Sequence, residues 1–171
     1  MLTIVSDTHR TDGHGLRDRT LEAVREAELV IHAGDFNREP VLDAFEREAA
    51  ELRGVYGNTD DEAIRDRLPA ERTVEYAGIR FAVTHTQRGG ETALALFGRE
   101  RDADVVVFGH THRPTFEARE PVSLLNPGSH AQPRGNRAAH AELEVTCNGL
   151  SGRLITPDGE AFERFLIEAT R

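Results

Sequence analysis

The sequence predicts a single α/β domain in which two sheets face each other and helices cover their outer sides. Apolar segments of strand length alternate with segments of helical periodicity over the first two thirds of the chain. One segment, Asp104–Phe108, is apolar enough for a strand buried on both faces, and only strand-like segments follow it. A length of 171 residues suits one domain, which we expect to span residues 1–171.

The predicted elements follow from the spacing of apolar residues and from the turn formers between them. The expected helices are Leu16–Ala27, Glu39–Ala50, Glu62–Arg67 and Glu91–Glu100. The expected strands before Asp104 are Leu2–Val5, Leu29–Ala33, Val55–Tyr56 and a hairpin of Thr73–Tyr76 with Ile79–Thr84, turning at Ala77-Gly78. The expected later strands are Thr115–Ala118, Ser123–Leu125, Ala141–Thr146, Arg153–Ile155 and Phe162–Glu168, with Asn126–Arg137 as a loop.

The charge composition is acidic and contains no lysine. All 21 basic residues are arginines, and the formal net charge is −9. Such a charge disfavours non-specific binding to nucleic acids or anionic membranes. Either a GC-rich genome or a halophilic host accounts for it, and of the two we favour the halophile, whose proteins carry excess surface carboxylates. The single cysteine, Cys147, excludes an internal disulfide. No basic leader or long apolar stretch is visible, so we expect a cytoplasmic protein without a membrane segment.

Five motifs share one context, in which an apolar strand runs into a polar exit. They are Ser6-Asp7-Thr8-His9, Gly34-Asp35, Gly57-Asn58-Thr59-Asp60, Thr84-His85 and Gly109-His110-Thr111-His112. The carboxyl ends of strands in an α/β sheet line one crevice, so these residues should converge there. Residues two apart in extended backbone point to the same side, so Asp7 with His9, and His110 with His112, could each reach one ion.

The residue types in these motifs indicate a site for two metal ions. Seven side chains are candidate ligands: Asp7, His9, Asp35, Asn58, His85, His110 and His112. Seven exceed what one tetrahedral ion can use, but they suffice for two ions that share a carboxylate. Imidazole and carboxylate without thiolate suit Mn, which we expect, or Ni, Fe, Co or Zn. Two ions at ~3.5–4 Å would activate a hydroxide for attack on a phosphate ester.

The ordered set of motifs resembles the calcineurin-like metallophosphoesterase superfamily, in particular its small archaeal and bacterial phosphodiesterase branch. The resemblance covers residue 2 to about residue 135, including Asn126-Pro127-Gly128-Ser129. It implies a four-layer α/β/β/α sandwich of two mixed sheets flanked by helices. It also implies that Asp35 bridges two ions, with Asp7, His9 and His112 on one and Asn58, His85 and His110 on the other. Asp35, Asn58 and His85 are thus our catalytic candidates.

The chain departs from the family pattern at two positions. Many members carry histidine where this chain has Thr59, and a threonine hydroxyl is a poor general acid at neutral pH. This favours diesters and good leaving groups over ordinary monoesters. The second departure is Thr86-Gln87, where a glycine and a further histidine are common. His85 is kept, although the loop around it differs.

Further residues are candidates for contacts with substrate. Asn58, Thr59, Arg10, His130 and Arg134 could hold the phosphate ester, the arginines by bidentate hydrogen bonds. We expect Asp60 to orient backbone groups behind the ligands instead of binding metal.

The sequence thus predicts a dimetal phosphoesterase that acts on a small phosphate ester, with a diester preferred. A non-catalytic interaction scaffold of the same fold, like the subunit of the retromer, is the alternative. Retention of all seven ligands favours the enzyme. The acidic charge argues against a nucleic acid as substrate, and homo-oligomerisation stays open.

Overall fold

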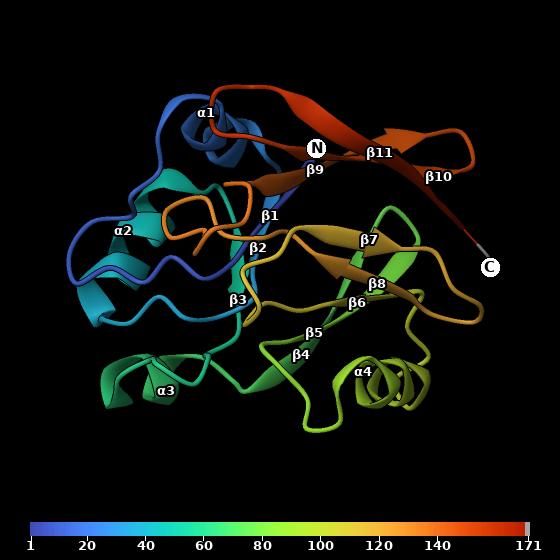
Figure 1. Ribbon diagram of the computed structural model, residues 1–171, viewed down its shortest axis with the longest axis horizontal. Coiled ribbons are helices and arrows are strands. Elements are labelled where there is room, and N and C mark those ends of the chain that lie inside the picture. Colours follow the sequence, from blue (N-terminus) through green and yellow to red (C-terminus); the bar gives the residue numbers. More distant parts are fainter. Residues whose placement is uncertain (170–171) are drawn as a thin grey trace.

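Residues 1–169, which the computed structural model describes, form two stacked sheets between layers of helices (Figure 1). The helices are α1 (Asp18–Glu26), α2 (Glu39–Glu48), α3 (Glu62–Arg67) and α4 (Gly90–Arg99). The first three cover the outer side of one sheet and α4 covers the outer side of the other. The four-layer sandwich expected from the sequence is confirmed.

The first sheet is mixed and has the strand order β11-β10-β9-β1-β2-β3. Its strands are β1 (Leu2–Val5), β2 (Leu29–His32), β3 (Leu52–Gly54), β9 (His140–Thr146), β10 (Gly149–Ile155) and β11 (Ala161–Glu168). Strands β1, β2 and β3 are parallel, and β9 joins β1 in the antiparallel direction. The βα units therefore build one half of this sheet, and the C-terminal meander builds the other.

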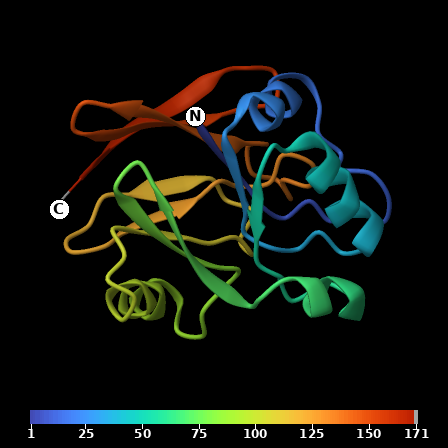
Figure 2. The same cartoon turned by 180° about the vertical axis from the view of Figure 1, so that it is seen from behind.

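The second sheet has the order β4-β5-β6-β8-β7 and is mixed as well. Its strands are β4 (Glu71–Tyr76), β5 (Ile79–Thr84), β6 (Val105–Val107), β7 (Thr115–Glu117) and β8 (Ser123–Asn126). Positive φ angles at Ala77 and Gly78 form the predicted tight turn between β4 and β5. Figure 2 shows the sandwich from behind, with this hairpin in front and α4 below it.

The main core lies between the sheets and consists mostly of aliphatic strand residues. Ile4, Ile31, Phe81, Val107 and Leu143 are fully buried members of it. Two smaller clusters lie beneath the helices, one under α1, α2 and α3 and one under α4. Burial on both faces explains why β1, β2 and β6 read as continuous apolar runs.

Element boundaries differ from the sequence prediction mainly in two strands. A strand was expected at Val55–Tyr56, but β3 ends at Gly54, where its pairing with β2 stops at His32. Strand β10 begins four residues before the predicted Arg153. Ser151 and Gly152 interrupt the apolar pattern in its first half, so the sequence did not predict a strand there. Gly152 is needed because a Cβ there would lie 2.1 Å from the Phe165 ring.

The carboxyl ends of the parallel strands of both sheets meet at one edge of the sandwich. The amide of Asp7, beyond β1, donates to the Gly34 carbonyl beyond β2 at 3.0 Å. In the second sheet, the Gly109 amide beyond β6 donates to the His85 carbonyl beyond β5 at 3.0 Å. The five motifs are thereby brought to one edge. Among residues 1–169, no helix is long and apolar enough to cross a membrane.

Candidate metal centre

Two buried carboxylates, Asp7 and Asp35, lie at the centre of the convergent motifs. Their residues are 0 % and 2 % exposed. Asp7, His9 and His112 form one compact group of metal-ligating atoms, and Asp7, Asp35 and His85 form a second. Because the two groups share Asp7, the cluster is continuous and holds five of the seven candidate ligands.

Three imidazoles direct the same ring nitrogen toward these carboxylates. His85 Nε2 lies 3.1 Å from Asp35 Oδ2, and His9 Nε2 lies 3.3 Å from the same oxygen. His112 Nε2 lies 3.4 Å from Asp7 Oδ1. All three nitrogens are buried and have no hydrogen-bond partner among the described residues. Buried polar atoms are rarely left unsatisfied, so the residues present fit a bound metal.

The opposite ring nitrogens set the tautomer of two of these histidines. His85 Nδ1 donates to the Ala33 carbonyl at 2.7 Å, and His112 Nδ1 donates to the Gln132 carbonyl. A carbonyl only accepts, so each Nδ1 carries the hydrogen, and in the neutral ring Nε2 keeps a lone pair facing the cluster. This second hydrogen bond is typical of metal-ligating histidines.

The charge state of the cluster is set by its carboxylates and their histidine neighbours. Burial raises the pKa of Asp35, but the contact with His85 and the Thr59 amide, 2.9 Å from Oδ1, together hold it well below its usual range. Burial lowers the pKa of His112, whereas the Asp35 carboxylate raises that of His85 against its own burial. Asp35 is therefore ionised at neutral pH.

Asn58 and His110 lie on the exposed side of the cluster. His110 Nδ1 and Asn58 Oδ1 are 3.0 Å apart, and the His110 ring meets the His85 ring edge-on, with 5.4 Å between centroids. Both residues are exposed. The His110 amide donates to Asp7 Oδ2 at 3.0 Å, which ties this loop to the buried carboxylate.

The backbone brings the ligands together in a way that differs from our expectation. We expected Asp7 with His9, and His110 with His112, to share a side of extended chain. All four residues instead have positive φ, between 45° and 70°, as does Asp35 at 62°. Left-handed backbone is uncommon for residues other than glycine and carries strain, which the hydrogen bonds around the cluster must offset.

Asp60 organises the backbone behind Asp35 and the third motif. Its carboxylate accepts the amides of Asp35 at 3.0 Å, Asn37 at 2.6 Å and Gly57 at 2.7 Å. Burial raises its pKa, and these three amides oppose the rise. The side chain thus orients three backbone amides and is absent from both ligand groups.

Thr59 lies at the exposed edge and is engaged through both its amide and its hydroxyl. The hydroxyl donates to Asn37 Oδ1 at 2.6 Å. Asn37, which sequence reasoning missed, has a φ of 89°. Its signal was weak, because an asparagine two residues after Gly34-Asp35 is an ordinary turn residue.

His130 does not face the cluster, contrary to its role as a substrate candidate. It is 2 % exposed, its Nε2 lies 3.1 Å from the Thr8 hydroxyl, and its ring packs edge-on against Phe45. Burial lowers its pKa to about 3. His32 contacts the other side of the same hydroxyl at 2.9 Å and accepts the Gly34 amide through Nδ1. Both histidines therefore support the loops from within the core.

The two arginine candidates lie at the rim of the site. Arg10 is exposed, and its backbone forms a bridge with Asn37. Arg134 is exposed and close enough to His112 for its charge to lower the pKa of that ring. Neither forms an ion pair with another described residue. Arg10 Nε donates to the Asp12 carbonyl and Arg134 Nη2 donates to Gln132 Oε1, each at 3.3 Å, so both guanidinium groups keep further donors for an anion.

Four further residues support the ligand loops. Ser6, Asn126 and Ser129 lie in motifs that the sequence singled out, and Gln132 was missed. Ser6 Oγ donates to Asp7 Oδ2 at 2.7 Å, and Ser129 Oγ donates to the Asp7 carbonyl at 2.7 Å. Asn126 holds the Gly109 carbonyl and the Thr111 hydroxyl, each at 3.0 Å. Gln132 contributes only its carbonyl, so its side-chain type gives no signal.

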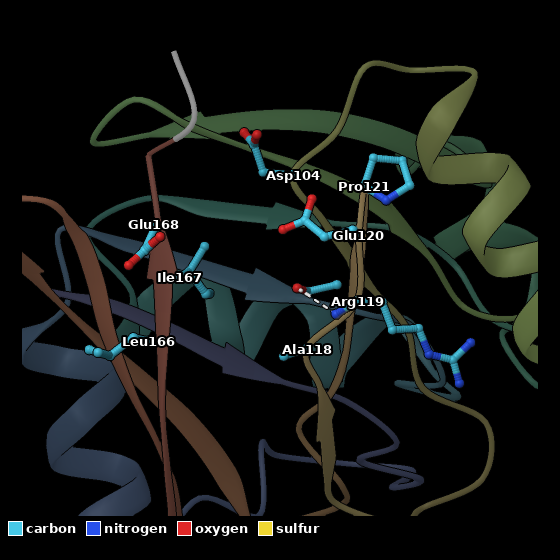
Figure 3. A pocket seen from close by; sticks show the side chains of 9 residues that line it. Asp104, Ala118, Arg119, Glu120, Pro121, Leu166, Ile167 and Glu168 are labelled. Carbon is cyan, nitrogen blue, oxygen red and sulfur yellow. Dashed lines mark hydrogen bonds between the residues drawn. The ribbon is translucent and has the colours of Figure 1, made fainter.

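A cavity of about 330 Å³ lies elsewhere, between β11 and the segment that joins β7 to β8 (Figure 3). Its lining includes Asp104, Arg119 and Leu166, and it contains no candidate ligand. Arg119 is neutralised there by Glu91 and Glu117. This cavity is therefore separate from the metal centre.

The fold and the cluster together define a metal-dependent phosphoesterase, a hydrolase of phosphoric esters. Residues 1–147 match the family model of the calcineurin-like phosphoesterase superfamily domain. The chain belongs to this family, as the motifs indicated.

Relatives and solved structures agree with this assignment. A probable metallophosphoesterase of Methanothermobacter thermautotrophicus is 34 % identical over 91 % of both chains. A phosphodiesterase of Methanocaldococcus jannaschii is 30 % identical over 73 % of this chain and 81 % of its own length. Vps29 of Entamoeba histolytica, solved with Zn²⁺, has a TM-score of 0.79 at 21 % identity and covers 98 % of this chain and 99 % of its own. That last likeness concerns the fold.

Proposed function

We propose that the protein is a phosphodiesterase that uses two divalent ions, Mn²⁺ in the first place, to hydrolyse a small diester. Asp7, His9 and His112 would hold one ion, and Asn58, His85 and His110 the other, with Asp35 between them. The observation that carries the proposal is the set of three partnerless, buried Nε2 atoms directed at two buried carboxylates. The two ligand groups that share Asp7 favour two ions over one.

The protein's own residues would prepare the site for a phosphate ester. When bound, divalent ions supply Lewis acidity that polarises phosphoryl oxygens and lowers the pKa of water. Asp35 stays ionised, and the carbonyls of Ala33 and Gln132 keep two imidazoles in the ligating tautomer. The exposed side chains of Asn58, Thr59 and His110 mark the side from which substrate would approach, and Arg10 and Arg134 would contact the phosphate from the rim.

The environment of Thr59 supports the preference for diesters with good leaving groups. Its hydroxyl already donates to Asn37 Oδ1, and an aliphatic hydroxyl is a poor acid at neutral pH. A leaving alcohol would therefore depart without a proton from this residue. Leaving groups of low pKa suffer least from that lack.

The direct test is hydrolysis of bis(4-nitrophenyl) phosphate by the purified protein with and without Mn²⁺ or Ni²⁺. We expect turnover that requires added metal and that exceeds the turnover of 4-nitrophenyl phosphate. Absence of turnover with every metal, together with no bound metal by elemental analysis, would contradict the proposal.

Two substitutions test the site itself. Asp35→Ala and His110→Ala should each reduce kcat/KM by at least about 100-fold, because each removes a proposed ligand. His110 is exposed, so its variant should keep the far-ultraviolet circular dichroism of the wild type. His14→Ala is the control, since His14 lies outside both ligand groups. Retained activity in either ligand variant would show that the site is wrongly assigned.

The alternative is a non-catalytic interaction scaffold of the same fold. Such a protein does not require an intact ligand cluster. The cluster therefore favours the enzyme. A cytoplasmic location and a homo-oligomeric state stay predictions, to be checked by cell fractionation and by light scattering of the purified chain.

A further inference from the structure

We propose that a cavity beside His85 binds a second anionic group of the substrate through Arg88, so that the preferred esters carry an anion on their alcohol portion. This inference rests on the proposed phosphodiesterase function and specifies its substrate class. The cavity measures about 490 Å³, and both Asn58 and His85 line it. An ester held at the metal centre would therefore extend one of its alcohol groups into this space.

The cavity is cationic in an otherwise acidic protein. Two arginines, Arg65 and Arg88, and one carboxylate, Glu71, contribute the charged side chains of its lining. The charge of Glu71 is compensated by Arg101, 2.7 Å away and outside the lining. The whole chain carries a formal charge of −9, so a local excess of positive charge here favours an anion.

Arg65 is fixed and provides the wall of the cavity. Its guanidinium donates to the carbonyls of Asp60 at 2.9 Å, Gly57 at 3.3 Å and Asn58 at 3.1 Å, and it lies 4.9 Å from the Tyr56 ring centroid. These contacts use carbonyl dipoles and a ring face, not a carboxylate. The positive charge of Arg65 therefore has no carboxylate partner in the part of the chain that the structure describes.

Arg88 is the group available to bind a ligand. It is exposed, and within residues 1–169 its guanidinium forms no hydrogen bond, ion pair or ring contact. Arginine presents a planar set of donors that matches a carboxylate or a phosphate. What indicates a role in recognition is the position of Arg88, on the wall of the same cavity that His85 and Asn58 line.

The segment that carries Arg88 is held in place by its neighbour. Gln87 Nε2 donates to Glu71 Oε1 at 2.9 Å and to Thr84 Oγ1 at 3.1 Å. These bonds fix the loop between β5 and α4, where the sequence departs from the family pattern. Arg88 follows Gln87 directly, so these bonds also restrain the backbone position of Arg88 beside the cavity.

Three matched diesters test the proposal: ethyl, 2-carboxyethyl and 2-phosphonoethyl 4-nitrophenyl phosphate. With the metal-loaded wild type, kcat/KM should be about threefold to tenfold higher for the two anionic esters, as expected for a partly exposed, charge-assisted contact. Comparison of the carboxylate with the phosphonate shows which anion fits better. Arg88→Gln should abolish the preference and Arg88→Lys should keep part of it.

Arg47→Gln is the matched control, because Arg47 is an exposed arginine of α2 without an ion pair among the described residues. It should leave both the rate and the preference unchanged. A wild type that hydrolyses all three esters equally, or an Arg88→Gln variant that keeps the preference, would overturn the subsite while leaving the phosphodiesterase standing.

Binding to the protein loaded with Zn²⁺, which is diamagnetic, gives a readout that does not depend on turnover. In ¹H–¹⁵N spectra, 2-carboxyethyl phosphate should shift the amides of residues 86–89 more than ethyl phosphate does, and Arg88→Gln should remove the difference. Equal shifts with both compounds would contradict the subsite even if no substrate turned over.

Discussion

At the scale of single residues, the site depends on a left-handed backbone conformation that residues other than glycine rarely adopt. Five ligand candidates have positive φ, and glycines lie beside them where a Cβ would collide. A Cβ on Gly109 would lie 2.1 Å from Ser6 Oγ and 2.6 Å from Asp7 Oδ2. The close approach of backbone to carboxylate, and not turn formation alone, therefore explains the glycines in these motifs.

Gly57→Ala tests this explanation. The added Cβ would lie 2.1 Å from Asp35 Oδ1 and 2.6 Å from the Asp35 amide, so it must displace the central carboxylate. We expect kcat/KM to fall by about 100-fold or more, since a shift of about 1 Å at a catalytic group has that effect. Gly54→Ala is the control, because its Cβ would first meet Leu68 Cδ1 at 3.1 Å. Equal losses of activity in both variants would contradict the explanation.

At the scale of elements, a buried ion network joins helix α1 to strands β9 and β10. Glu142 is fully buried, and its carboxylate contacts Arg19 at 2.8 Å, Arg153 at 3.0 Å and His140 at 2.9 Å. Thr20 meets the other nitrogen of His140 at 3.0 Å. This network attaches the helix that covers the first sheet to its antiparallel half.

Glu142→Gln should destabilise the protein by about 3 kcal/mol at pH 7, because it leaves buried donors and two cations without their carboxylate. Burial raises the pKa of Glu142, but His140 and Arg19 together lower it from 4.5 to about 2. The stabilisation is therefore complete above about pH 4.5 and is lost as the pH falls toward 2. Urea unfolding should show the difference between wild type and variant shrinking over that interval.

The control for this prediction is Glu144→Gln. Glu144 is exposed and pairs with Arg153 at 2.8 Å, and exposed pairs contribute little. A loss of stability equal to that of Glu142→Gln, or a difference that persists unchanged at pH 2, would show that the buried network is not the source.

At the scale of the whole molecule, the metal centre joins the two sheets. Asp7 and Asp35 follow strands of the first sheet, whereas His85, His110 and His112 follow strands of the second. Any cation bound among them links both halves of the sandwich. Folding and metal binding should consequently be coupled.

Metal removal tests this coupling. The Tm of protein stripped with EDTA should rise on addition of Mn²⁺, because a ligand at 100 times its Kd stabilises the folded state by about 2.7 kcal/mol. Asp35→Ala should lose most of the shift, whereas Glu144→Gln should keep it. An unchanged Tm in the wild type at saturating Mn²⁺ would contradict a metal that bridges the sheets.

Much of the architecture was predictable because buried strands appear in the sequence as continuous apolar segments. The apolar runs of β1, β2 and β6 are buried on both faces, and Ala77-Gly78 permits only a tight turn, so composition and position agreed with the fold. Strand β10 was half missed, because Gly152 is there to accommodate Phe165 of a neighbouring strand. A contact between side chains of two different strands does not produce a periodic pattern of apolar residues, so the sequence alone does not reveal it.

The sequence by itself determined the family and the ligand types, since seven metal-ligating side chains at five strand exits require neither distances nor angles to be recognised. Only the tertiary structure decided how those side chains face one another. The ligand residues have left-handed backbone where extended chain was expected. His130 is buried instead of facing the substrate, and Arg88 lies on a cavity that His85 also lines. The physical reason is that orientation and burial arise from long-range packing and hydrogen bonds, whereas strand exits and turn residues are fixed by local chemistry.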